Sequence, residues 1–203
     1  MFDAHAHIGV YTDKALINTS SPEEASGAAN YPFKCVGLLP ESGSDNLSLF
    51  EDYLKKGFHA GEIGLDKRFG CKEQQISLFR SAMELSKHYD RLITIHAVGF
   101  TDEILKAIRE IKPKRFIVHG FTGSFEIAEQ ITRLGGIISL GLRSLRCRDI
   151  RKLISLPFLT ESDMKAGIEA EIALNQLITS LDLLSGKDTE YCTEYYIKEL
   201  LDV

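Results

Sequence analysis

The chain contains no tryptophan, and only four cysteines and five prolines occur among its 203 residues. The cysteines are scattered and form no C-x-x-C pair, which excludes a disulfide framework and is typical of reduced thiols in a cytoplasmic protein. No run of eighteen apolar residues occurs, so no membrane span is predicted. The opening stretch, MFDAHAHIGV, lacks the basic and long apolar segments of a signal peptide. We therefore expect a cytoplasmic protein.

Basic charge is also in deficit, since 24 Lys and Arg stand against 29 Asp and Glu for a net charge of −5. This balance argues against a protein that coats duplex DNA with a broad basic face. The acidic excess is concentrated in residues 161–203, which hold 3 basic and 10 acidic side chains. The rest of the chain is therefore close to neutral, and the net charge says little about a site built from it.

Eight short apolar runs alternate with stretches of helical periodicity or with short crossovers. Several runs are apolar throughout, as expected for strands that are buried on both faces. The alternation predicts an α/β fold with a parallel sheet, either a closed barrel or a doubly wound open sheet. No G-x-G-x-x-G and no P-loop is present, which counts against a nucleotide-binding open sheet. The predicted strands cover residues 2–7, 14–18, 33–39, 58–65, 92–96, 115–119, 136–140 and 157–161.

The helices are predicted from their start and stop signals. A short one is expected after Ser21, with Pro22 at the first helical position. The others are expected between the later strands, and two more close the chain after the last strand. Length favours a single domain over residues 1–203, although this is near the lower limit for an eight-unit barrel. These further helices are predicted at 45–56, 73–88, 102–111, 125–134, 167–184 and 189–201.

Histidines and acidic residues gather at the carboxyl ends of the predicted strands. His5 and His7 alternate along the first strand, so both side chains point to the same side. A parallel barrel brings such strand ends together on one face, where active sites are built. Imidazole and carboxylate groups bind divalent metals, so the sequence predicts a site for one or two ions. The predicted ligands are His5, His7, Glu62, His96, His119 and Asp163, whereas His59 and His88 are expected to be structural or surface residues.

The chain resembles the TatD-like metal-dependent hydrolases, a branch of the amidohydrolase superfamily with a TIM-barrel fold. Residues 3–7 (DAHAH) fit the D-x-H-x-H motif, and residues 61–66 (GEIGLD) fit the GEIGLD box. Residues 95–96 (IH), 119–124 (HGFTGS) and 161–163 (ESD) fit the later motifs in the family's order. The resemblance implies a compact (β/α)8 TIM barrel with closing C-terminal helices.

The resemblance also implies roles for the predicted ligands. His5, His7 and Asp163 would hold one ion, His96 and His119 would hold the other, and Glu62 would bridge the two. Asp3 would orient a histidine rather than bind metal. Hydrolysis would use metal-activated water, since a divalent ion lowers the pKa of bound water to about 7. Asp163 would accept the proton, which makes Asp163 and Glu62 the predicted catalytic residues.

The chain departs from the family pattern at positions expected to face substrate. Leu39 stands where the family's G-x-H-P motif has histidine, and Val98 stands where its H-x-R motif has arginine. A lost phosphate-binding arginine costs about 1–3 kcal/mol of charge-assisted hydrogen bonding. Lys165 replaces the proline of the last motif.

Basic residues elsewhere could replace the lost arginine. Arg143, and less so Arg146, follows the seventh predicted strand closely enough to reach the mouth of the barrel. The alternative is that the basic stretch 142–152 is a solvated helix face. Lys67 and Arg68 directly follow the GEIGLD box and form a second basic candidate at the rim.

Three functions are compatible with this pattern. The leading hypothesis is a phosphodiesterase or deoxyribonuclease of TatD type, with single-stranded DNA or a small phosphorylated molecule as its substrate. The apolar Leu39 and Val98 suit a neutral substrate, so amidohydrolase-type C–N or lactone hydrolysis is the second. The third is a weakly catalytic relative that binds metal or a partner protein. Zn, Mg and Mn are all compatible with the ligand set, and the sequence leaves the oligomeric state open.

Overall fold

The computed structural model describes residues 1–202, and all eight predicted strands are present in it. Each strand begins and ends within two residues of its predicted range. Every strand pair is parallel. The strands are β1 (Asp3–His7), β2 (Ala15–Asn18), β3 (Cys35–Leu38), β4 (His59–Asp66), β5 (Ile93–Val98), β6 (Phe116–Val118), β7 (Ile137–Leu140) and β8 (Phe158–Thr160).

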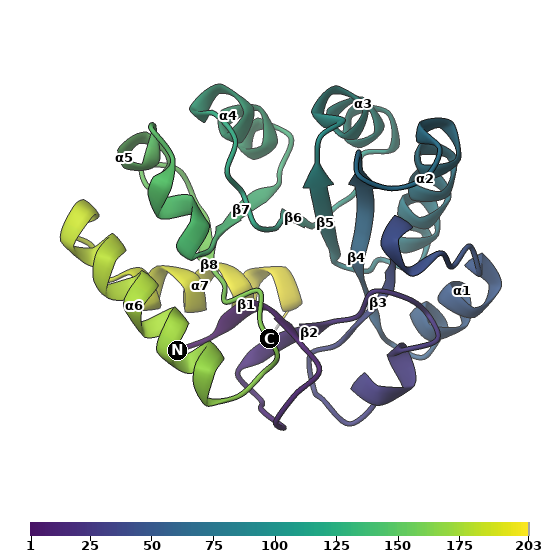
Figure 1. Ribbon diagram of the computed structural model, residues 1–203, viewed down its shortest axis with the longest axis horizontal. Helices are drawn as coiled ribbons and strands as arrows, with labels where there is room; N and C mark the ends of the chain where they lie inside the picture. The colour runs from purple at the N-terminus through teal and green to yellow at the C-terminus, as the bar shows by residue number, and fades with distance from the viewer. Residues whose placement is uncertain (203) are drawn as a thin grey trace.

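The strands close into a barrel, because short bridges join a six-stranded sheet, β3 to β8, to the β1–β2 pair. Ile17 bridges to Lys34 on one side, and His7 bridges to Lys165 on the other. Figure 1 looks along this barrel, with the helices around its outside. The parallel α/β barrel predicted from the sequence is therefore confirmed.

Most predicted helices form within one or two residues of their expected ends. Asn46 starts the first of them, since its Oδ1 accepts a hydrogen bond from the Leu49 N–H at 3.1 Å. Apolar side chains at helical spacing turn each of these helices toward the strands. They are α1 (Leu47–Lys55), α2 (Lys72–His88), α3 (Thr101–Ile111), α4 (Phe125–Arg133), α6 (Ile168–Ser185) and α7 (Thr189–Leu201).

The connections are shortest in the early part of the barrel. The prediction of a helix starting at Ser21 is wrong, because Pro22 and its neighbours form turns that lead into the 3-10 helix η1 (Ala25–Ala28). Residues 8–14 connect β1 to β2 without a helix.

Two later connections also contain short helices. After β3, the 3-10 helix η2 (Pro40–Ser42) precedes α1. The basic stretch after β7 forms the 3-10 helix η3 (Leu142–Arg146) and the short α5 (Ile150–Leu153).

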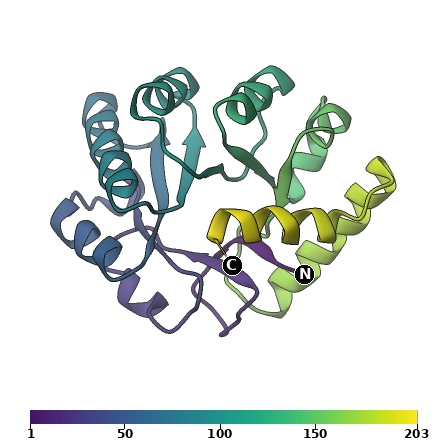
Figure 2. The same ribbon diagram turned by 180° about the vertical axis from the view of Figure 1, so that it is seen from behind.

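The last helix closes one end of the barrel. α7 lies behind the strands in Figure 1 and in front of them in Figure 2. Its Ile197, Leu200 and Leu201 pack against a ring of buried apolar side chains from the amino-terminal parts of the strands, including Ala4 and Leu16. The open end is therefore the one that holds the carboxyl ends of the strands. Within residues 1–202, no helix has the length and apolarity needed to cross a membrane.

Candidate metal centre

A bulge in β1 aims two histidines into the barrel. Asp3 pairs with Ala15 and Ala6 pairs with Ile17, so three steps along β1 correspond to two steps along β2. β1 therefore holds one extra residue in this stretch, which is a bulge. Asp3 stabilises this irregular stretch, since its Oδ1 accepts from the backbone N–H of His5 at 3.1 Å and of Ser162 at 3.0 Å. Asp3 thus holds the backbone of a histidine rather than its ring. Burial raises the pKa of Asp3 to about 7.

A second bulge places Glu62. Between Ala60 and Ile63, β4 again has one residue more than its neighbours. The glycines of the GEIG segment are needed here for close approach: a Cβ on Gly64 would lie 2.0 Å from the His96 carbonyl oxygen, and one on Gly61 would lie 2.4 Å from Asn18 Oδ1. Larger side chains at either position would push the neighbouring strand away from the carboxylate.

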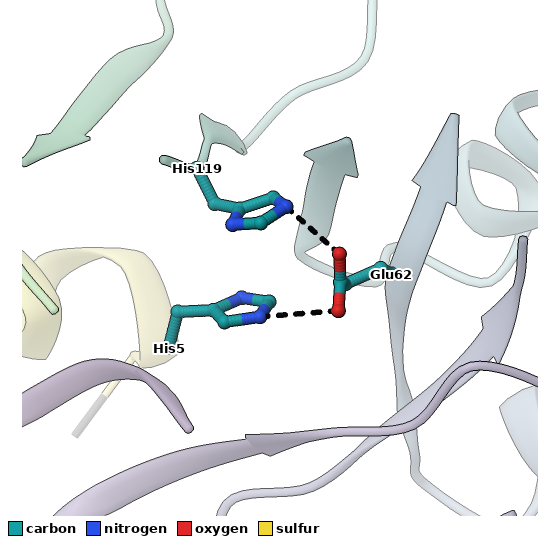
Figure 3. Close-up of side chains that lie close together, drawn as sticks. All are labelled: His5, Glu62 and His119. Carbon is teal, nitrogen blue, oxygen red and sulfur yellow. Dashed lines mark ion pairs between the residues drawn. The ribbon is translucent and has the colours of Figure 1, made fainter. Parts of the chain in front are cut away.

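The two oxygens of Glu62 face two different groups of histidines. Oε1 lies 3.2 Å from His5 Nε2 and 3.5 Å from His7 Nε2. Oε2 lies 2.8 Å from His119 Nε2 and 3.0 Å from His96 Nδ1. Figure 3 shows the carboxylate at the edges of the rings of His5 and His119, with one oxygen toward each, and these rings stack with their centroids 4.0 Å apart. This is the geometry of a carboxylate that can serve two neighbouring ions.

Asp163 completes the group around Oε1. Its Oδ1 lies 3.3 Å from His7 Nε2 and 3.8 Å from His5 Nε2. The backbone at Asp163 is left-handed, with φ at 56°, a conformation that aspartate tolerates better than most residues. Its N–H donates to the His5 carbonyl at 3.1 Å, so the turn after β8 is tied directly to β1.

The arrangement of the ring nitrogens in the centre fits a cation. Within residues 1–202, neither buried ring nitrogen of His5 makes a hydrogen bond, although Nε2 lies 3.2 Å from Glu62 Oε1 and points into the space shared by the carboxylates. His96 Nδ1 and His119 Nε2 face each other at 3.1 Å, an arrangement that two lone pairs favour only with a proton or a metal between them. The six residues predicted as ligands thus lie together, and the donor set of imidazoles and carboxylates suits divalent ions.

The electrostatics of the centre keep its carboxylates ionised. Burial opposes charge on Glu62, but the facing His119 and His5 outweigh it and hold the pKa of Glu62 well below its usual value. Burial likewise raises the pKa of Asp163, and the hydrogen bond from His7 overcomes it, so the net shift is downward. Burial dominates at His5 and lowers its pKa. Ionised carboxylates and a neutral His5 suit metal binding, whereas Glu62 and Glu161 outweigh burial and raise the pKa of His119, so His119 would release a proton when an ion binds.

Two buried acids contact the ring nitrogens of His96 and His119 that face away from Glu62, and the sequence analysis gave these acids no role in the site. Asp66 Oδ2 lies 3.2 Å from His96 Nε2, and Glu161 Oε1 lies 3.6 Å from His119 Nδ1. Glu161 also accepts from the Gly120 N–H at 2.7 Å and from the Ser139 hydroxyl. Carboxylates in this position fix the tautomer and orientation of a ligating ring. The available signal was spacing, because Glu62 and Asp66 lie four apart on β4 and share its inner side.

The predicted substrate-binding residues lie on exposed segments. Arg143 is exposed on η3 directly after β7, and Lys67 is exposed after β4 with its stem against Gly99. Arg68 pairs with Asp66 instead of pointing freely into solvent, since its Nε donates to both oxygens of Asp66 at 2.9 and 3.0 Å. Of these three cations, Arg143 and Lys67 have the freer side chains.

Comparison with known proteins agrees with the fold and with a family of metal-dependent hydrolases. The family described as TatD related DNase matches residues 3–166. An Escherichia coli protein described as the uncharacterized metal-dependent hydrolase YjjV is 35% identical over 141 residues, covering 63% of this chain and 54% of that protein. A Methanocaldococcus jannaschii protein, also described as an uncharacterized metal-dependent hydrolase, is 27% identical over 103 residues, covering 49% and 41%.

Solved structures show the same fold. The crystal structure of the E. coli YjjV TatD homologue superposes with a TM-score of 0.78 at 25% identity, covering 95% of this chain and 87% of that one. A TatD-like protein from Archaeoglobus fulgidus gives a TM-score of 0.67 at 17% identity over the whole of both chains. Since the family match spans most of the chain, the protein belongs to the TatD-related DNase family. The aligned part spans about half the length of the curated relatives.

Proposed function

We propose that the protein is a divalent-metal-dependent hydrolase that cleaves phosphoric esters, with single-stranded DNA or a small phosphorylated molecule as substrate. The observation that carries the proposal is the division of Glu62 between two histidine groups, with Oε1 toward His5 and His7 and Oε2 toward His96 and His119. An arrangement that can hold two ions on one carboxylate suits in-line displacement at phosphorus.

His5, His7 and Asp163 would hold one ion, His96 and His119 the second, and Glu62 would be shared. When bound, such ions supply Lewis acidity and lower the pKa of a coordinated water to about 7. Asp66 and Glu161 would hold the rings of His96 and His119 in the orientation that this binding needs.

Substrate would approach from the side of His7 and Asp163. Their side chains are 29% and 40% exposed, whereas His5 is fully buried and Glu62 is 5% exposed. Asp163 therefore combines a position at the solvent-facing edge with a pKa below its usual value, so it is ionised and able to accept a proton from an attacking water. Arg143 and Lys67 would attract the phosphate from the rim.

A neutral substrate is a second candidate, supported by Leu39. Leu39 directly follows β3, at the end of the barrel that holds the carboxyl ends of the strands, and it is 2% exposed. An apolar group at this place offers nothing to a phosphate and would suit a C–N or lactone bond. The substrate comparison must therefore include amides and lactones.

The test combines metal quantification with hydrolysis assays on single-stranded DNA, phosphomonoesters, amides and lactones. Wild-type protein loaded with Zn, Mn or Mg should bind one or two ions and cleave a phosphoric ester. Glu62→Gln and His96→Ala should lose bound metal and nearly all turnover, whereas His88→Gln, remote from the centre, should retain both. Metal-loaded protein that is inert on every phosphoric ester contradicts the proposal, and cleavage of an amide or lactone instead supports the second candidate.

A further inference from the structure

A hollow of about 380 Å³ lies beside the metal centre, between α3 and α4. This volume is within the range of small-molecule sites. Its floor consists of the buried side chains of Ile104, Val118 and Ile131. His119, whose Nε2 lies 2.8 Å from Glu62 Oε2, is part of its lining. The hollow and the metal centre therefore share one wall.

The lining fits a neutral group. Among the lining residues in the described part of the chain, 1–202, His119 alone can carry charge, and the others are aliphatic, aromatic, glycine or hydroxyl-bearing. The hydroxyl residues Thr101, Thr122 and Ser124 stand at the exposed or half-exposed rim above the apolar floor. A flat ring with a polar edge would place its faces against the aliphatic side chains and its edge against the hydroxyls. A phosphate would meet no lysine or arginine there.

The rim is anchored on both sides. The Phe121 N–H donates to the Ser139 carbonyl at 2.9 Å, and the Ser144 hydroxyl donates to the Phe121 carbonyl at 2.7 Å. The loop also wraps closely around this aromatic ring, since a Cβ on Gly123 would lie 2.8 Å from Phe121 Cζ. Because these bonds fix the loop, the hollow is formed before a ligand binds, which lowers the entropic cost of binding.

We propose that the hollow is a subsite for a neutral heteroaromatic ring that the substrate carries beside the cleaved bond, namely the base of the terminal nucleotide of single-stranded DNA. The inference rests on the proposed function, because it assumes that the bond cleaved at the metal centre is a phosphoric ester. Beyond the proposed function, the inference identifies the part of the substrate that binds on the far side of His119, namely the base. It also proposes that the base is recognised by apolar contacts rather than by charge.

The first experiment compares metal-loaded cleavage of two single-stranded oligonucleotides that differ only at the terminal nucleotide, one with its base and one abasic. Wild type should prefer the base-containing substrate by at least about tenfold in kcat/KM, as expected for one stacked base. Ile127→Trp and Thr101→Trp fill the hollow from opposite helices, and each should reduce the preference to near unity. Glu129→Trp, on α4 but outside the lining, should keep it.

A binding measurement separates this inference from the proposed function. Calorimetric titration of the metal-loaded protein with a deoxynucleoside monophosphate and with deoxyribose phosphate should give an affinity ratio of about tenfold or more, lost in both filled variants. If no phosphoric ester, these oligonucleotides included, is cleaved but this ratio is found, the proposed function is wrong and the subsite stands. A wild-type ratio near one, or a ratio that survives both Ile127→Trp and Thr101→Trp, overturns the subsite whether or not DNA is cleaved.

Discussion

His59 should make the protein lose stability in mild acid, independently of the metal centre. It begins β4 at the end of the barrel opposite the centre, and its Nδ1 accepts a hydrogen bond from the Leu92 N–H at 3.3 Å, which requires an unprotonated nitrogen. Burial, with Arg115 and Arg91 nearby, lowers the pKa of His59 to about 4. The unfolded chain, with an ordinary histidine pKa, therefore takes up a proton at a pH where the folded protein does not.

The sign and size follow from proton linkage. Stability rises with pH wherever the unfolded state binds more protons, so the contribution is complete above about pH 6.5 and is lost as the pH falls toward 4. With pKa values of about 6.5 unfolded and about 4 folded, the free energy of unfolding should fall by about 2 kcal/mol between pH 7.5 and 5.0 because of this residue alone.

The assay is urea unfolding of metal-free wild type and His59→Gln at both pH values, followed by circular dichroism. The variant is neutral throughout, so its loss of stability between the two pH values should be smaller than that of wild type by about 2 kcal/mol. Other titrating groups contribute equally to both proteins and cancel in this difference. Equal pH dependence in the two proteins would refute the reasoning, and a steeper dependence in the variant would reverse its sign.

Three further substitutions test separate parts of the structure. Asp66→Asn removes the charge behind His96 and should weaken metal binding by about 10- to 100-fold, measured by titration of the metal-free protein; unchanged affinity would deny Asp66 its supporting role. Arg115→Met removes hydrogen bonds to the Leu200 and Asp90 carbonyls, at 2.9 and 2.8 Å, and should lower the free energy of unfolding by about 3 kcal/mol in urea. Arg143→Ala should raise the KM for a phosphoric ester about tenfold with kcat retained, and a KM within twofold of wild type would remove Arg143 from substrate binding.

The strands and the grouping of the candidate ligands were predictable because both follow from local pattern. Short apolar runs gave the strand order, and acids and histidines at strand ends gave the centre once a barrel was assumed. The histidine pair on β1 was predicted by simple alternation from His5 to His7. That alternation holds only after the bulge, which no local propensity reveals.

The parts that escaped prediction depend on contacts between distant segments. Glu161 lies in the motif at residues 161–163, but its support of His119 arises only because β6, β7 and β8 are neighbours. The helix expected after Ser21 had a good cap and a proline in the right place, yet the chain there must turn back within a few residues to reach β3. α7 was predicted as a helix, whereas its place across the barrel end depends on packing against Ala4 and Leu16.

The bridge between His7 and Lys165 joins two segments that are far apart in the sequence. During synthesis His5 and His7 are made long before Asp163, which lies 156 residues after His7. Neither histidine can meet Asp163 or its backbone partners in the turn after β8 until that turn has left the ribosome. Closure of the barrel is therefore a long-range step, and the nascent chain must be kept from aggregating while β1 lacks this neighbour.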